Sequence, residues 1–174
     1  MSTKFHLQFP SLEIPVLAQH FGYPVKENKL YDLRAGIAKR GFLTLEELKV
    51  VCRWKSVRSQ SRVAKNTAAD VEAITKVCFE TKNERLRIGS LLLLEGVQYP
   101  TASVLLHFFH PDPYPILDVR ALESLGIQKP PAYDFGFWSQ YVAFTRQLAK
   151  ESSVDMRTLD KALWQWSKNV KKII

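Results

Sequence analysis

The segment LEGVQYPTASVLLHFFHPDPYPILD, residues 94–118, decides how this chain is interpreted. An apolar run is interrupted at Gly96-Val97, and a second apolar run follows from Thr101 to Phe109. Three prolines then force an extended connection, because proline disfavours the helical conformation in the residue before it. The segment ends on a single acid, Asp118, in front of VRALESLG. We therefore expect two helices joined by a short turn, then a rigid spacer that leads to the acid.

The Gly-Val turn has two interpretations. In the first, backbone N–H groups exposed beside the start of the second helix act with the helix dipole to attract one phosphate of a nucleic-acid backbone. In the second, Gly96 is the C-cap of the first helix in an ordinary helical hairpin. The turn alone does not separate the two.

The rest of the chain carries helix signals. Two capping boxes, Thr44-Leu-Glu-Glu47 and Thr81-Lys-Asn-Glu84, each open a helix, and Asn66 or Thr67 caps another. Apolar periodicity predicts further helices over residues 31–39, 101–109, 119–125, 137–150 and 156–170. FHLQF, residues 5–9, alternates like a short strand, and no later segment does. We expect an all-α fold that forms a single domain over residues 1–174.

Composition bounds the function. Lys and Arg total 25 against 17 Asp and Glu, so the net charge is +8. This excess favours a polyanionic partner such as nucleic acid, although a basic surface also serves solubility. The two cysteines, Cys52 and Cys78, are too few for an iron–sulfur cluster or a four-thiolate zinc site. They are expected to be free thiols. With no signal peptide and no membrane-length apolar run, we expect a cytoplasmic monomer.

The stretch RWKSVRSQSRVAKN, residues 53–66, is the most basic part of the chain and contains no acid. It is a candidate for a second nucleic-acid contact, in which Trp54 stacks on a base or wedges into the duplex. The alternative is a solvated loop whose Trp54 packs on the core. Its cations are Arg53, Lys55, Arg58, Arg62 and Lys65.

The longer pattern resembles the helix-hairpin-helix DNA glycosylase superfamily (HhH-GPD). The resemblance is carried by L-x-G-V-x-x-x-T-A-x-x-L-L and, after the prolines, P-x-x-D-x-R-x-L-x-x-L-G. The matching residues are Leu94, Gly96, Val97, Thr101, Ala102, Leu105, Leu106, Pro115, Asp118, Arg120 and Gly126. The stretches CRWKS, TASVLLHF, PYPILDVRAL and RTLDKALWQWSK also resemble an uncharacterised bacterial group, which brings no function with it.

The resemblance implies two small helical lobes with a cleft between them and a hairpin core at about residues 82–126. Members of the family flip a nucleotide out of DNA and cleave its N-glycosidic bond. The acid at the Asp118 position would be catalytic, because a carboxylate stabilises the positive charge left on the sugar or activates water. The alternative is that Asp118 serves only as a helix N-cap.

The resemblance also implies roles for other residues. The expected DNA contacts are Gly96, Val97, Gln98, Tyr99, Thr101, Arg53, Trp54, Lys55, Arg58 and Arg62. The expected base pocket consists of Tyr99, Tyr133, Trp138 and Tyr141, although aromatic residues at this density also build cores. The carbonyl groups of Leu92, Leu94 and Val97 would hold a sodium or potassium ion.

Two positions depart from the family pattern. Bifunctional members carry a Schiff-base lysine where this chain has Pro100, so strand cleavage by an amine is not expected. The second glycine of the hairpin is replaced by Gln98. We therefore expect a monofunctional glycosylase that uses water and acts in base excision repair on duplex DNA. The alternatives are a non-catalytic DNA-binding module of the same fold and a protein-interaction domain.

Overall fold

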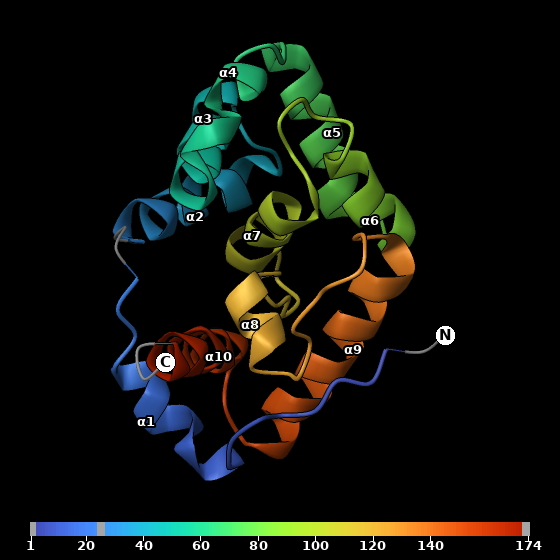
Figure 1. The fold of residues 1–174 in the computed structure, drawn as a ribbon. Coiled ribbons are helices and arrows are strands. Elements are labelled where there is room, and N and C mark those ends of the chain that lie inside the picture. The colour runs from blue at the N-terminus through green and yellow to red at the C-terminus, as the bar shows by residue number, and fades with distance from the viewer. Residues whose placement is uncertain (1–2, 24–26, 172–174) are drawn as a thin grey trace. The chain divides into compact units, whose positions relative to one another are not determined.

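The computed structural model describes residues 3–23 and 27–171, and within these ranges it contains helices, turns and extended connections but no β-strand (Figure 1). The prediction of an all-α fold is confirmed. The chain divides into two compact units. We call the one that contains described residues 27–111 the hairpin unit, and the one that contains 3–23 and 112–171 the acid unit.

The hairpin unit is built around one central helix. Its elements are α2 (Asn28–Arg40), α3 (Leu45–Lys55), η2 (Val57–Ser59), α4 (Gln60–Val63), α5 (Ala68–Glu80), α6 (Glu84–Leu91) and α7 (Tyr99–Phe109). Helix α7 contacts α2, α3 and α6, and most of its side chains are buried. An apolar sequence on all sides of a helix is typical of such a buried position. In Figure 1, α7 lies between the α2–α3 pair and the α5–α6 pair.

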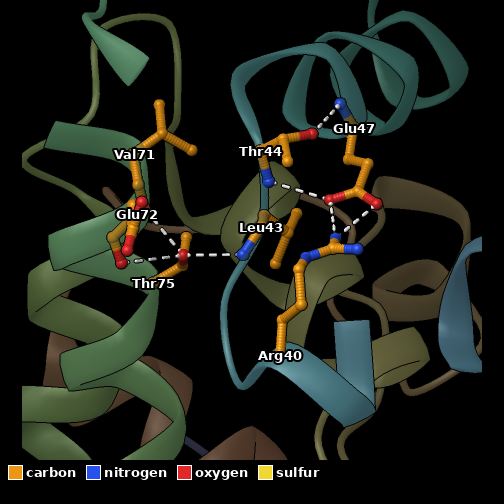
Figure 2. Close-up of polar contacts among 7 residues, drawn as sticks. All are labelled: Arg40, Leu43, Thr44, Glu47, Val71, Glu72 and Thr75. Carbon is orange, nitrogen blue, oxygen red and sulfur yellow. Dashed lines mark hydrogen bonds and ion pairs between the residues drawn. The ribbon is translucent and has the colours of Figure 1, made fainter. Parts of the chain in front are cut away.

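The predicted capping box at the start of α3 is confirmed, and Figure 2 shows its contacts. The Glu47 N–H donates to the Thr44 hydroxyl over 3.3 Å, and the Thr44 N–H donates to the Glu47 carboxylate over 2.8 Å. The same carboxylate accepts two hydrogen bonds of 2.6 Å from Arg40. The preceding turn is tied to α5, because the Leu43 N–H donates to the Thr75 hydroxyl over 2.9 Å.

The predicted capping box at residues 81–84 is wrong. The N-cap of α6 is Asn83, whose side chain accepts a hydrogen bond of 3.0 Å from the Leu86 N–H. Asn is as good an N-cap as Thr, and its position two residues later sets the start of the helix. Thr81 instead accepts from the Asn83 N–H over 3.1 Å. The cap of α5 is Thr67, so Asn66 is available for another contact.

The acid unit consists of η1 (Ser11–Glu13), α1 (Ile14–Gln19), α8 (Val119–Glu123), α9 (Phe135–Glu151) and α10 (Met156–Val170). Helix α10 packs against α1, α8 and α9 and so forms the centre of this unit. The predicted helix at 156–170 is confirmed at both ends. Helices α8 and α9 differ from their predicted bounds by one or two residues, which is the usual uncertainty of helix ends.

The strand-like pattern at residues 5–9 corresponds to an extended segment without a sheet partner. The His6 N–H donates to the Leu125 carbonyl over 3.2 Å, and the Gln8 N–H donates to the Ser124 carbonyl over 3.0 Å. Side chains along the segment alternate between partly buried and exposed positions. The alternation therefore reflects extended chain packed beside the end of α8, because any extended segment has a side-chain period of two.

Both cysteines are buried free thiols, as expected. Burial raises the pKa of the Cys52 thiol to about 12 and that of the Cys78 thiol to about 12, so both stay protonated and unreactive. Among the helices that the structure describes, none is long and apolar enough to cross a membrane.

Candidate functional site

The turn between α6 and α7 places glycine where no other residue fits. Gly96 has a φ of +79°, in the left-handed region that favours glycine. A Cβ atom there would lie 2.7 Å from Cγ2 of Val63 and 3.0 Å from the carbonyl oxygen of Ser59. The turn is closed by a hydrogen bond of 3.1 Å from the Val97 N–H to the Leu94 carbonyl. The glycine therefore allows the turn to form. It also allows the turn to approach residues 53–66 closely, the stretch that we call the basic segment.

The start of α7 offers fewer free donors than the sequence predicts. Gln98 is the exposed N-cap, and its carbonyl accepts the N–H groups of Thr101 and Ala102 over 2.9 Å each. The Gln98 N–H donates to no group in the described residues. Thr101 is 5% exposed, so its side chain, which we expected to contact DNA, lies in the core instead. Gln98 is therefore the exposed residue of this helix start.

The predicted ion site at the hairpin carbonyls stays a prediction. The Leu94 carbonyl already accepts the Val97 N–H, which leaves it one further lone pair for a cation. In the described ranges, His, Cys, Asp and Glu form no group of three that could hold a metal. That result does not concern the backbone carbonyls of Leu92, Leu94 and Val97.

The basic segment begins in the last turn of α3 and continues through η2 and α4. Arg53, Arg58, Arg62 and Lys65 are exposed, and none of the four forms an ion pair within the part of the chain that the structure describes. Lys55 is half-buried. Trp54 is 7% exposed, and its ring meets Phe108 edge-on at 5.7 Å, so it belongs to the core. The exposed large apolar side chain of this segment is that of Val57.

One residue joins the basic segment to the hairpin. The Asn66 amide donates to the Glu95 carbonyl over 3.0 Å, and its oxygen accepts the Glu95 N–H over 2.8 Å. The same amide donates to the Val63 carbonyl over 2.8 Å. From the sequence, Asn66 is predicted only as a possible helix cap, because nothing local signals a partner that lies 29 residues further along the chain.

Asp118 is the N-cap of α8. Its side chain accepts a hydrogen bond of 2.9 Å from the Arg120 N–H, and the residue is half-buried. Burial is the larger cause of a raised pKa at Tyr23 and at Tyr133, and the negative charge of Asp118 adds to the increase. Both phenols therefore lie near Asp118 and stay neutral. The N-cap interpretation of Asp118 is confirmed, and its catalytic role stays a prediction.

The proline-rich spacer before Asp118 is held by α9 and α10. The Tyr141 hydroxyl donates to the Ile116 carbonyl over 2.9 Å, and the Ile116 N–H donates to buried Asp160 over 3.2 Å. The Arg146 side chain donates to the Pro113 carbonyl over 2.7 Å. These three contacts, which the sequence does not predict, fix the position of the spacer and therefore of Asp118 at its end.

Two residues of the predicted base pocket are core residues. Trp138 is 1% exposed and stacks on Tyr114 at 5.9 Å. Tyr141 is fully buried, and its hydroxyl donates to the Ile116 carbonyl of the spacer. Tyr133 is half-buried and lies near Asp118, while Tyr99 is half-buried at the start of α7. Core packing therefore accounts for Trp138 and Tyr141, and Tyr133 is the pocket candidate of the acid unit.

Comparisons with protein-family models, curated proteins and solved structures find no match to this chain. Function is therefore argued from the chain's own residues. Two groupings carry that argument: the hairpin joined to the exposed cations in one unit, and Asp118 with its two phenols in the other.

Proposed function

We propose that this protein is a monofunctional DNA glycosylase-like protein, which binds duplex DNA through its hairpin unit and hydrolyses an N-glycosidic bond with Asp118. The observation that carries the proposal is the junction between the hairpin and the basic segment. Gly96 packs on Ser59 and Val63, and Asn66 bonds to both main-chain groups of Glu95. Cations and hairpin therefore belong to one surface.

The exposed cations supply affinity without sequence preference. Each phosphate that a Lys or Arg neutralises releases a condensed counterion. The logarithm of the binding constant therefore falls linearly with the logarithm of the salt concentration. Among the described residues, Arg53, Arg58, Arg62 and Lys65 have no acidic partner to displace before they meet a phosphate. The Gln98 N–H and side chain at the start of α7 would add contacts to a backbone phosphate. Trp54 takes no part, because it is buried.

The proposed chemistry uses water. As the bond between the sugar C1′ and the base nitrogen breaks, the electron pair leaves with the base and positive charge develops on the sugar. The Asp118 carboxylate stabilises this charge and accepts a proton from the attacking water, whose oxygen bonds to C1′. The Arg120 N–H holds the carboxylate in place. Pro100 has no amine, so no Schiff base forms at that position.

A second candidate function is a non-catalytic DNA-binding module. One observation favours it: Asp118 caps α8, and this role alone accounts for an aspartate at that position. In this case the hairpin unit still binds DNA, and the acid unit only completes the fold. Both functions require binding, and they differ in whether a base is released.

The test is base release from duplex oligonucleotides that contain alkylated, oxidised, deaminated or modified-pyrimidine bases. We expect release by the native protein and its loss in Asp118→Asn, since Asn retains the cap but carries no charge. The matched control is Asp134→Asn, because Asp134 caps α9 through a hydrogen bond of 2.7 Å from the Phe137 N–H. DNA binding without base release on any substrate would support the module, and equal release by Asp118→Asn would remove the catalytic role.

A further inference from the structure

Asn66 is the structural link between two segments that the proposed function assigns to one ligand. Its amide makes a reciprocal pair of hydrogen bonds with the main chain of Glu95, over 3.0 Å and 2.8 Å. A third bond, of 2.8 Å, reaches back to the Val63 carbonyl at the end of α4. One side chain therefore ties the residue before Gly96 to the end of the basic segment.

The second contact between these segments is direct packing. Gly96 touches the carbonyl oxygen of Ser59 and the nitrogen of Val63 so closely that a Cβ would lie 3.0 Å from each. In the chain, Ser59 follows Arg58 and Val63 follows Arg62, and both arginines are exposed. The two arginines are therefore attached to the very backbone on which the hairpin rests, and a change at the junction moves them relative to the hairpin.

We propose that Asn66 is a positioning residue that makes the hairpin and the arginines one preformed surface, and that this surface selects duplex over single-stranded nucleic acid. This inference rests on the proposed function and adds the residue that sets the preference for a duplex. Phosphates of a duplex are already regularly spaced, so a preformed surface binds them with little ordering cost. A flexible single strand must first be ordered on the surface. A preformed spacing of the cations therefore adds less to its affinity.

The experiment compares one oligonucleotide as a duplex and as a single strand, for the native protein, Asn66→Ala and Asn83→Ala. Asn83 is the matched control, because its side chain also makes a structural hydrogen bond in the hairpin unit but caps the start of α6, away from the turn, and does not join the turn to the basic segment. We expect Asn66→Ala to weaken duplex binding about tenfold and single-strand binding less than about twofold. Asn83→Ala should leave the ratio of the two affinities unchanged.

Several outcomes would overturn the inference. A parallel loss of both affinities in Asn66→Ala would show that the residue serves only stability, and two unchanged affinities would show that Asn66 does not position the surface. If Asn66→Ala does not fold, Asn66→Ser replaces it, with the same expectation. A native protein that binds neither form would overturn the proposed function itself, whereas native binding with an unaffected Asn66 variant overturns only this inference.

Two further measurements examine the mechanism of positioning. Amide hydrogen exchange at Glu95 should accelerate in Asn66→Ala and not in Asn83→Ala, because Asn66 accepts the Glu95 N–H. A double-mutant cycle adds Arg62→Ala, whose cost to duplex binding should be smaller in the Asn66→Ala background than in the native one. Additive costs would mean that the arginine and the hairpin act independently, which contradicts the proposal.

Discussion

At the scale of single residues, Gly96 carries the strictest requirement. Its φ of +79° and its distance to the backbone of Ser59 and Val63 both disfavour a side chain. We predict that Gly96→Ala lowers the free energy of unfolding by at least about 2 kcal/mol, because a left-handed alanine and a backbone clash add together. Urea denaturation measures this change.

The control for that substitution is Gly89→Ala. Gly89 lies inside α6, and a Cβ there meets nothing within 4 Å. Alanine should stabilise this helix by roughly 0.5–1 kcal/mol, since glycine is a poor helix former. Equal effects of the two substitutions would contradict the role assigned to Gly96.

Asp155, the N-cap of α10, should contribute a pH-dependent part of stability. The Thr158 N–H donates to it over 2.7 Å, and this bond is the main cause that lowers the pKa of Asp155 below its usual 3.8. A lowered folded-state pKa stabilises the protein above the unfolded pKa, and this contribution is lost as the pH falls through the folded value. Asp155→Asn should therefore differ most from the native protein above about pH 4, and the difference should shrink in acid. A difference that stays constant from pH 7 to 3 would be evidence against this account.

At the scale of elements, the start of α3 depends on its capping box. We predict that Thr44→Ala lowers the free energy of unfolding by about 1 kcal/mol, because the Glu47 N–H loses its acceptor. Thr44→Ser, which keeps the hydroxyl, should cost much less. The comparison is made by chemical denaturation, and an equal cost for Ala and Ser would show that the methyl group matters instead of the cap.

Sequence patterns predicted the elements better than the contacts between them. Capping and periodicity are local properties, so α3, α7 and α10 could be predicted from neighbouring residues. Where two local signals compete, as Thr81 and Asn83 do at the start of α6, the pattern alone does not choose between them. Asn66 and Asp160 also bond to residues 29 and 44 positions away, Glu95 and Ile116, and no local pattern indicates such pairs.

The candidate site was predictable to the same extent. The Gly-Val turn, the cap at Asp118 and the cations of the basic segment are all local features of the sequence. Whether Trp54, Trp138 and Tyr141 face a ligand or the core depends on packing, and the structure buries all three. Burial of aromatic side chains is the common outcome, because each removes a large apolar area from water.

At the scale of the whole molecule, the net charge is +8, and some of the cations behind it can be located on one surface. Of the 25 cations, Arg53, Arg58, Arg62 and Lys65 lie exposed on the segment that Asn66 joins to the hairpin, and none of the four forms an ion pair with the described residues. A net charge alone fits a solubilising surface equally well. The two interpretations differ in whether particular arginines set the response of binding to salt.

The most direct measurement is duplex DNA affinity across a salt series, for the native protein and for Arg58→Ala/Arg62→Ala. The account predicts that native affinity falls steeply with salt and that the double variant reduces the slope of log K against log salt by roughly 2. Lys29→Ala/Lys39→Ala, which removes the same charge from α2, should keep nearly the native slope. No salt-dependent affinity in the native protein, or equal slopes in the two double variants, would contradict the account.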